Sequence, residues 1–365
     1  MASEQSKLTH LCMYFSNRTF KIKLIDFISK LYSLFRGCPQ GGILSPILFS
    51  LFYNGVGDSI FSKFYWLFAD DLSFYTFNSD INKLIFDLSR ILKELDTWCS
   101  GRDLIINFTK TKYLIVSKTH QDGPFPSLTC RGNVIERVEE FRYLGIIFDS
   151  TLSFDQHFDY VSHRVSSAIG CLHKLKRYIS VETFRTLLNS FVLSIIDYGL
   201  IIWGSLCASK LDKLQSKINS LLGSYFFPNL VNKFQKICKI AKSYENHHYK
   251  LPKINYLDLY EECNILTVSE RFKYFSAVFC YKSTRFDWIP ELTNNFRPSN
   301  STRNNNFLIP SHNSEFFKKS SFYQSIVVWN SLSSEAKDTN LSLRQFCRIL
   351  NQWIIGKRLD EFVSR

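Results

Sequence analysis

Apolar residues recur every three or four positions from about residue 153 onward, and this pattern dominates the last two thirds of the chain. The spacing predicts one helix over 154–175, a second over 182–196 and a third over 209–222. Residues 313–365 return to the same pattern and predict further amphipathic helix. The core candidates of that last segment are Trp329, Leu332, Phe346, Ile349, Leu350 and Trp353.

The first third of the chain mixes the signals of strands and helices. Residues 64–77, FYWLFADDLSFYTF, consist of two aromatic-rich apolar runs around an Asp-Asp pair, which predicts a β-hairpin buried on most of its surface. Shorter strands are expected at 104–108, 113–117 and 141–148. Together with the helices that follow, these strands predict an α+β fold.

Two helices are expected to flank this hairpin in sequence. Ser45-Pro46 is typical of an N-cap followed by proline at the first helical position, before apolar residues at helical spacing. After the hairpin, Asn78 or Ser79 is expected to cap a strongly amphipathic helix that Gly101 ends.

Composition and charge narrow the class of protein. The chain has 365 residues, of which 45% are hydrophobic and 21% charged, so it is globular, with room for two or three domains. The net charge of +13 favours a polyanionic partner, nucleic acid before an anionic membrane. Residues 201–250 carry eight Lys against two acidic residues, although a solvated helix face explains this equally well.

Several other classes are unlikely on composition. The longest apolar stretch, 191–204, is too short to span a bilayer and contains Asp197, and the N-terminus has no apolar signal segment. Ten Cys are present, but none form a CxxC pair, which argues against a zinc ribbon. The Cys are therefore expected to be reduced, small apolar residues of an intracellular protein.

Two short motifs could carry chemistry. Asp70-Asp71 would lie at the tip of the predicted hairpin, where paired carboxylates suit Mg²⁺, although most Asp pairs in turns are merely solvated. Upstream, residues 36–49, RGCPQGGILSPILF, combine Gly, Pro39 and Gln40 just before a helix. Such a loop permits close approach of a ligand to the backbone, but an ordinary Gly-Pro loop into a helix is the simpler interpretation.

Two weaker motifs follow. Lys110 and Lys112 lie between two strand candidates, where a cation could meet a phosphate or simply belong to a basic turn. Gly145 interrupts the predicted strand FRYLGIIFD, residues 141–149, and indicates a bulge or a close approach by another backbone.

The order of these motifs is more specific than any one of them. Gly-Cys-Pro-Gln-Gly, then Phe-Ala-Asp-Asp, then Asn-x-x-Lys-Thr-Lys, then Tyr-Leu-Gly resembles the reverse transcriptase of non-LTR (LINE-type) retrotransposons, most closely the jockey and I groups. YFSNRTF at 14–20, LSFDQHF at 152–158, IIDYGLIIWG at 195–204 and LTVSERFKYF at 266–275 extend the resemblance to about residues 10–355.

The resemblance implies an RNA-directed DNA polymerase with a right-hand fold. Residues 1–150 would be a partial palm of antiparallel sheet and helices, and 151–222 a helical thumb. Residues 223–292 and 313–365 would form a mainly helical C-terminal region around an Asn-rich linker at 293–312. RNA template with DNA primer, or an RNA/DNA hybrid, and deoxynucleoside triphosphates would be the partners, with no membrane. Action would be nuclear and cytoplasmic.

The same resemblance assigns roles by position. Asp70 and Asp71 would bind Mg²⁺, of which the family uses two ions, and Lys110 would protonate the leaving pyrophosphate. Pro39, Gln40 and Gly41 would line the template and nucleotide site. The turn at 143–145, Tyr143, Leu144 and Gly145, would position the primer end.

The chain also departs from the family pattern. A further catalytic Asp is expected on a palm strand upstream of the YFSNRTF-like segment, and the only acidic residues before the Pro-Gln-Gly loop are Glu4 and Asp26. We therefore expect an N-terminally truncated polymerase that is inactive alone. The alternative is a nucleic-acid-binding remnant without chemistry.

Overall fold

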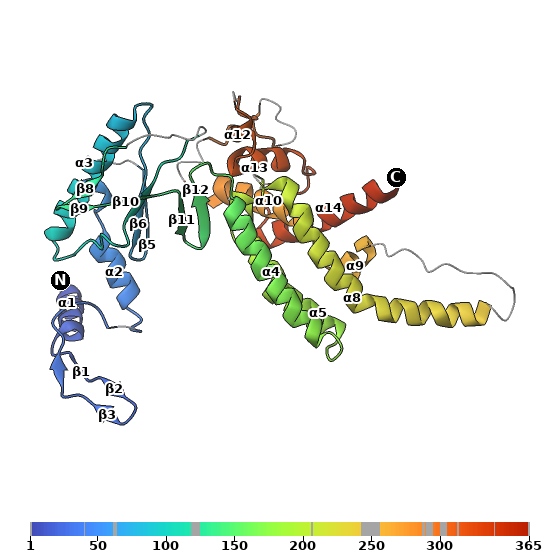
Figure 1. Cartoon of the computed structure of the whole chain (residues 1–365), viewed down its shortest axis with the longest axis horizontal. Coiled ribbons are helices and arrows are strands. Elements are labelled where there is room, and N and C mark those ends of the chain that lie inside the picture. The colour runs from blue at the N-terminus through green and yellow to red at the C-terminus, as the bar shows by residue number, and fades with distance from the viewer. Residues whose placement is uncertain are drawn as a thin grey trace. The chain divides into compact units, whose positions relative to one another are not determined.

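The computed structural model describes residues 2–39, 41–60, 64–117, 125–205, 207–241, 256–286, 289, 295–299, 305–311, 314–338 and 340–363 (Figure 1). The chain divides into two compact units, each considered by itself below. The first comprises Met1–Tyr113 with Gln121–Val138, and the second comprises Leu114–His120 with Glu139–Arg365. Helices and short antiparallel strand pairs make up these units, which confirms the α+β class.

The first unit consists of helices and two-stranded hairpins. Its elements are α1 (Ala2–Phe15), β1 (Thr19–Phe20), β2 (Lys23–Leu24), β3 (Phe27–Ile28), β4 (Tyr32–Ser33), α2 (Ser45–Tyr53), η1 (Gly57–Ser59), β5 (Tyr65–Phe68), β6 (Asp71–Phe74), α3 (Ile81–Ser100), β7 (Lys112–Leu114), β8 (Thr129–Cys130), β9 (Asn133–Val134) and β10 (Glu136–Val138). β1 pairs with β4, β2 with β3, β5 with β6, β7 with β10 and β8 with β9.

Helix α3 supplies most of the apolar core of this unit. One part of its buried face, Ile91, Leu95 and Trp98, packs with Val56 and Ile60. Leu92 instead packs with side chains of 128–135. The N-cap is Asp80, whose carboxylate accepts from the Asn82 N–H at 2.8 Å, so the expectation of Asn78 or Ser79 was wrong. Gly101 ends the helix as predicted.

The start of α2 also differs from the prediction. Ser45 is its first residue and Leu44 occupies the cap position, with no side-chain cap. The Ser45 hydroxyl donates to the Pro39 carbonyl at 2.6 Å, so it closes the preceding loop rather than the helix end. Pro46 still lies in the first turn, where its missing N–H costs nothing.

The hairpin of β5 and β6 is much less buried than its composition indicated. All four residues of β5 are exposed, including Trp66 at 52% and Phe68 at 61%. Within the described residues β5 pairs only with β6, so no third strand covers its other edge. Helix α2 likewise buries none of its side chains, and Leu51 is 64% exposed.

The expected strands after α3 are only partly present. Residues 104–108 form no strand in the described structure, and the 113–117 prediction shrinks to β7. The predicted strand over 141–148 is two strands, β11 (Glu140–Tyr143) and β12 (Ile146–Asp149), which pair as a hairpin in the second unit. Gly145 therefore marks a turn and not a bulge.

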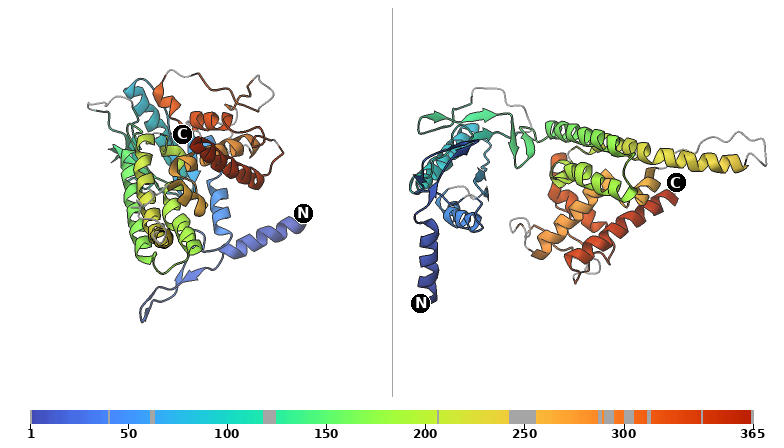
Figure 2. Two further views of the ribbon diagram at one scale, coloured as in Figure 1. Left: turned by 90° about the vertical axis from the view of Figure 1, so that its right-hand side faces the viewer. Right: turned by 90° about the horizontal axis from the view of Figure 1, so that it is seen from below.

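Helices dominate the second unit, as the spacing predicted (Figure 2). They are α4 (Asp155–Leu175), α5 (Val181–Leu187), the π-helix η2 (Leu188–Leu193), α6 (Ser194–Asp197), α7 (Leu200–Trp203), α8 (Ala208–Ala241), α9 (Tyr256–Glu262), α10 (Val268–Phe286), α12 (Glu315–Lys318), α13 (Ser321–Asn330) and α14 (Leu343–Val363). The predicted helix over 182–196 is thus a continuous α5, η2 and α6. The prediction over 209–222 was too short, because α8 continues through Gly223 and Pro228.

Helices α4 and α8 lie side by side (Figures 1 and 2) and form the first core of this unit with η2 and α6. Phe158, Val161 and Val165 of α4 are buried there. Lys217 of α8 donates to the Ser162 carbonyl at 3.1 Å and to the Ser166 hydroxyl at 2.7 Å. Lys210 of α8 pairs with Asp155 at 2.7 Å. Part of the basic stretch therefore joins two helices instead of facing solvent.

A second core joins α10, α13 and α14, and it includes Trp329, Leu332, Phe346 and Leu350 as predicted, with Ile349 and Trp353 partly buried. Both described ends of the Asn-rich segment contact this core. Phe296 is 6% exposed, and the Asn305 carbonyl accepts from the Trp329 indole at 2.9 Å. Residues 290–294 and 300–304 lie outside the described residues. No helix in the described ranges is long and apolar enough to cross a membrane.

The described cysteines differ sharply in accessibility. Burial raises the pKa of both Cys207 and Cys263 to about 11, whereas Cys12 and Cys171 are exposed. Because the thiolate is the nucleophile, we expect iodoacetamide at neutral pH to modify Cys12 and Cys171 first, as measured by peptide mass spectrometry. Unfolding in concentrated guanidinium chloride should equalise the rates. Equally fast modification of Cys263 in the folded chain would contradict this packing.

Candidate functional site

The Asp-Asp pair occupies the turn of the β5–β6 hairpin. Phe68 is the partner of Asp71 in the strand register, so Ala69 and Asp70 form a two-residue turn. Ala69 has a φ of +53°, which is the left-handed conformation that tight hairpin turns require. Asp70 and Asp71 are both exposed, and neither forms an ion pair within the described residues. The two carboxylates therefore lie at the surface of the hairpin, and their role in binding a metal ion stays a prediction.

Packing orients this hairpin against α2 and α3. Leu72 and Phe74 of β6 pack on the core formed by Val56, Ile91 and Trp98, which fixes one face of the hairpin. Burial raises the pKa of Tyr53, at the end of α2, and the charges of Cys99 and Asp70 contribute to that rise. Tyr53 packs on the same core as Leu72 and Phe74, so the end of α2 and one face of the β5–β6 hairpin share that core.

The loop before α2 has a defined conformation. Gly37 and Gly41 have φ values of +77° and +80°, a region where side chains are disfavoured. Ser45 binds the Pro39 carbonyl and also lies 3.2 Å from the Tyr14 hydroxyl. Pro39 is half-buried, Gly41 is exposed, and Gln40 lies outside the described residues.

The structure distinguishes the two lysines that followed α3. Asn107 organises their turn, since its carbonyl accepts from the Lys110 N–H at 3.1 Å. Lys110 is exposed, and its ammonium group has no partner within the described structure. The Lys112 ammonium forms an ion pair with Glu136. Lys110 is therefore the better candidate for a phosphate contact.

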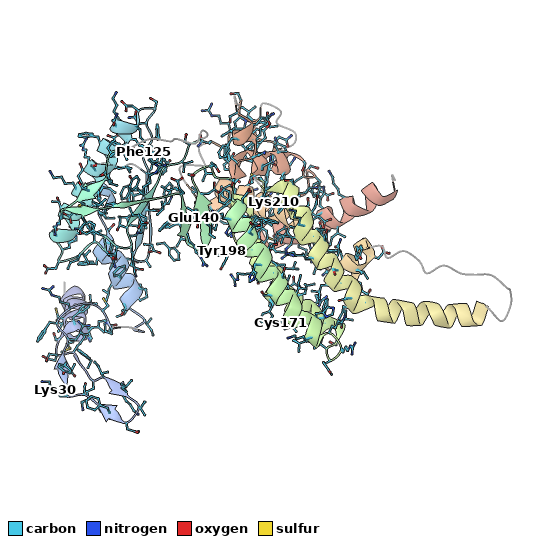
Figure 3. All side chains as sticks on the ribbon, viewed as in Figure 1. Lys30, Phe125, Glu140, Cys171, Tyr198 and Lys210 are labelled. Carbon is cyan, nitrogen blue, oxygen red and sulfur yellow. The ribbon has the colours of Figure 1, made fainter. Side chains whose placement is uncertain are left out.

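In the second unit, the Tyr143–Gly145 segment forms the turn between β11 and β12. Leu144 and Gly145 have φ values of +46° and +85°. Tyr198 is labelled in Figure 3. Its hydroxyl donates to the Leu144 carbonyl at 2.5 Å, and a Cβ on Gly145 would lie 3.2 Å from its ring. The close approach to Gly145 that the sequence indicated is therefore made by a side chain and not by a backbone.

A cavity of about 310 Å³ adjoins this turn, with Arg142, His157, Arg164 and Tyr198 among its lining residues. Arg142 and Arg164 both donate to the Tyr160 hydroxyl, at 2.9 and 3.3 Å. Neither guanidinium group forms an ion pair with a described acidic residue, and none of the lining residues is acidic. The cavity is therefore positively charged and suited to an anion such as a phosphate.

His157 contributes a further donor to this cavity. Its Nδ1 accepts from the Ile147 N–H at 3.3 Å, so a neutral ring carries its proton on Nε2. Nε2 is buried and has no hydrogen-bond partner in the described structure. The sequence did not single out these residues. The sequence signal that could have identified them is the helical spacing of positions 157, 160, 161 and 164, which follow Arg142 along the chain.

Burial, with a smaller effect of Arg142, lowers the pKa of His157 to about 4. The native state therefore binds fewer protons than the unfolded chain between about pH 6.5 and 4, and stability falls as the pH drops through that window. The free energy of unfolding should fall between pH 7 and pH 5, and His157 should account for about 2 kcal/mol of that fall. We therefore expect the fall to be smaller by this amount in His157→Asn, as measured by urea denaturation at the two pH values. The matched control is His163→Asn, which replaces an exposed histidine of the same helix.

The structure therefore brings together only some of the predicted site residues. In the first unit, the end of α2 and one face of the hairpin that carries Asp70 share a core, and in the second unit the 143–145 turn adjoins a positively charged cavity. Within the described residues no group of three or more His, Cys, Asp or Glu side chains could hold a metal ion. Any cation at the hairpin would depend on Asp70, Asp71 and oxygen atoms from a ligand.

Comparison with known proteins agrees with these motifs. Residues 8–148 match the family model described as reverse transcriptase (RNA-dependent DNA polymerase). The chain is 24% identical over 220 residues to the RNA-directed DNA polymerase from mobile element jockey of Drosophila melanogaster, covering 55% of this chain and 23% of that protein. It is 25% identical over 216 residues to a probable RNA-directed DNA polymerase from transposon BS of the same species, with the same coverage.

A third relative is the Pol polyprotein of the type-1 retrotransposable element R1 of Nasonia vitripennis, 25% identical over 199 residues, or 51% of this chain and 57% of that protein. No solved structure matches. The matched region spans about a quarter of the length of the jockey and BS proteins.

The hairpin that carries Asp70 and the Pro-Gln-Gly loop both lie within residues 8–148, the region that matches the reverse transcriptase family model. The relatives to which the chain is similar are RNA-directed DNA polymerases of mobile elements, among them jockey and transposon BS.

Proposed function

We propose that this chain contributes part of the active centre and the primer-binding surface of an RNA-directed DNA polymerase. The observation that carries the proposal is the pair of exposed carboxylates at the β5–β6 turn, which have no ion-pair partner among the described residues and lie in the region that matches the reverse transcriptase family. RNA template, DNA primer and deoxynucleoside triphosphates are the proposed partners. The proposed setting is a retrotransposon that acts on chromosomal DNA in the nucleus.

The carboxylates of Asp70 and Asp71 fit Mg²⁺ by their chemistry. Mg²⁺ prefers oxygen ligands and is commonly held by one or two carboxylates together with substrate phosphates and water. When bound, such ions stabilise charge on the attacking and leaving oxygens of nucleotidyl transfer. In this proposal the hairpin presents both carboxylates, Lys110 donates a proton to the leaving pyrophosphate, and Pro39, Gln40 and Gly41 contact template and nucleotide.

We propose that the second unit acts as a thumb that holds the primer strand. Tyr143, Leu144 and Gly145 would position its end, while Arg142, Arg164 and the Nε2–H of His157 would meet a backbone phosphate. The unpaired guanidinium groups support this assignment, because phosphate contacts position a strand without reading its sequence.

The exposed apolar faces of the first unit support a place within a longer polymerase. Trp66 and Phe68 of β5 and Ile47 and Leu51 of α2 are all more than half exposed. Burying such side chains stabilises a fold by about 1.5–3 kcal/mol each. We propose that further polypeptide of the same polymerase covers them.

A second candidate function is nucleic-acid binding without chemistry. The observation that favours it is the lack of any cluster of three potential metal ligands in the described ranges, because a two-ion site needs a carboxylate shared between the ions. In this case the chain would hold RNA or DNA through its cationic surfaces alone.

Primer extension on an RNA template with Mg²⁺ tests the proposal. Incorporation that depends on Asp70 supports the polymerase and excludes binding alone. If the chain instead binds RNA in a salt-sensitive manner and extends no primer, the second candidate is the function of this chain. The matched variants for this experiment are described in the Discussion.

A further inference from the structure

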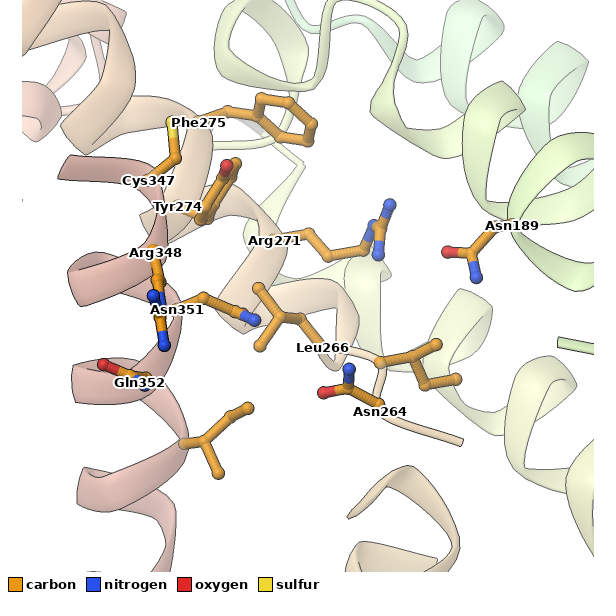
Figure 4. A pocket seen from close by; sticks show the side chains of 12 residues that line it. Asn189, Asn264, Leu266, Arg271, Tyr274, Phe275, Cys347, Arg348, Asn351 and Gln352 are labelled. Carbon is orange, nitrogen blue, oxygen red and sulfur yellow. The ribbon is translucent and has the colours of Figure 1, made fainter. Parts of the chain in front are cut away.

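The second unit contains a larger cavity, of about 560 Å³, that involves none of the residues considered so far for catalysis (Figure 4). Its walls come from η2, from the connection between α9 and α10, from α10 itself and from α14. Its volume lies within the ~300–1,000 Å³ typical of sites for small ligands. All of its lining residues belong to the described part of the chain.

Part of the lining of this cavity is apolar. Ile265 and Leu266 are 3% and 8% exposed, and Phe275 and Ile355 complete the lining on the α10 and α14 sides. Such a surface favours a flat or apolar group, whose transfer from water is stabilising.

Polar side chains with unused hydrogen-bonding capacity surround that surface. Asn264, Asn351 and Gln352 line the cavity, and their carboxamides have no hydrogen-bond partner in the described structure. In Figure 4, Asn351 points from α14 into the space between α14 and α10. Carboxamides offer a paired donor and acceptor, the pattern that matches the edges of nucleobases.

The charge of the cavity is positive. Arg271 extends toward Asn189 (Figure 4), but its guanidinium group is held by Asp197, to which Nε donates at 2.6 Å. Arg348 has no ion pair with any described residue. Burial also raises the pKa of Tyr274, which keeps this phenol neutral. No lining residue is acidic, so Arg348 is available for an anion.

We propose that this cavity binds one unstacked nucleotide of a single-stranded nucleic acid. The base packs on Leu266 and Phe275, its polar edge meets the carboxamides of Asn264 and Asn351, and the adjoining phosphate pairs with Arg348. Proteins commonly recognise single strands in this way, because an unstacked base exposes both its face and its hydrogen-bonding edge. A fully paired duplex presents no such base and does not enter.

This site goes beyond the proposed polymerase function and does not rest on it. Every residue that forms it belongs to the second unit, and none is placed in nucleotidyl transfer or primer positioning. The chemistry is common to RNA and DNA, which differ here in the 2′-hydroxyl. Single strands of both kinds therefore serve as probes.

The test measures binding of the full chain to fluorescein-labelled oligouridylate, oligodeoxythymidylate and an RNA/DNA duplex, each of about ten nucleotides, by fluorescence anisotropy at fixed salt. We expect Arg348→Gln and Asn351→Asp each to raise the Kd for a single strand about tenfold, and the Kd for the duplex less than about twofold. The matched control is Arg344→Gln, which removes the same charge one turn earlier on α14, outside the cavity. It should change the single-strand Kd less than about twofold.

Photocrosslinking locates the contact independently of affinity. RNA containing 4-thiouridine should crosslink to peptides within 264–275 or 345–355, and Asn351→Asp should reduce the yield. Equal losses for Arg344→Gln and Arg348→Gln, an equal loss for the duplex, or crosslinks confined to other segments would overturn the proposal. A loss of affinity in Arg348→Gln and Asn351→Asp for the RNA strand alone, or for both single strands, supports the proposal. The comparison also shows whether the site takes an RNA nucleotide only or a nucleotide of either kind.

Single-strand binding and primer extension, measured on the same preparations, separate this proposal from the polymerase proposal. Variants are compared only when their far-UV circular dichroism and melting temperature match those of the parent chain, and Asn351→Asp provides a second, isosteric change. Asp70→Asn should leave the single-strand Kd unchanged. If the chain extends no primer and Arg348→Gln still raises the single-strand Kd, the nucleotide site stands independently of the polymerase proposal.

Discussion

Asp70→Asn is expected to reduce primer extension about 10³-fold in any preparation containing this chain that extends a primer. The substitution keeps the shape of the side chain and removes the charge that would bind Mg²⁺. A catalytic metal ion contributes several kcal/mol, and each 1.4 kcal/mol is a tenfold change in rate. The rate of incorporation of a labelled deoxynucleotide on a primed RNA template measures the effect.

The chain contains a matched control for this substitution. Asp26 lies at the second position of another two-residue turn, in which Leu24 is the partner of Phe27 and Ile25 has a φ of +51°. The turn at Ala69-Asp70 has the same construction. Asp26→Asn should therefore leave incorporation within about twofold, since surface substitutions change little. Equal losses for both variants, or no loss for Asp70→Asn, would refute a catalytic role of Asp70.

Asp197→Ala is expected to lower the free energy of unfolding of the second unit by about 3 kcal/mol. Both oxygens of Asp197 accept from the guanidinium group of Arg271, and the two side chains are only 20% and 14% exposed. Removing the carboxylate leaves the cation with poor access to water and without its partner. Urea denaturation followed by circular dichroism measures the change.

A double-mutant cycle provides the control for this ion pair. Asp197→Leu together with Arg271→Met removes both charges and should cost less than Asp197→Ala alone, because the uncompensated charge is absent. If the double variant loses as much stability, relative to the parent chain, as Asp197→Leu and Arg271→Met lose separately when added together, the two residues act independently and the pair is not the source of the stability.

The helices were predictable because their signal is local. The buried positions of α4, which include Phe158, Val161 and Val165, recur at helical spacing, and each was identified from its neighbours in sequence. The caps were harder, because several polar residues in a row can each accept from the first N–H groups. Asp80 occupies the cap, although Asn78 and Ser79 have the same chemistry.

Burial of the strands was not predictable in the same way. An apolar strand is buried only when another element covers it. Within the described residues, β5 pairs with β6 alone. The roles of the two lysines after α3 show the same limit. Lys110 and Lys112 look alike in sequence, and only the position of Glu136 distinguishes the paired one.

The sequence by itself determined the type and approximate place of most helices, the Asp70 turn and the reverse transcriptase relationship, because these depend on spacing and motif order along the chain. Tertiary structure decided which of these groups have partners. Asp197 interrupts an apolar stretch of the sequence, which does not reveal its partner. In the folded chain its carboxylate accepts from Arg271, 74 positions away. Among the described residues, the same folding gives His157, Arg142 and Arg348 no acidic partner, because an ion pair depends on distance in space, which the spacing of residues along the chain does not encode.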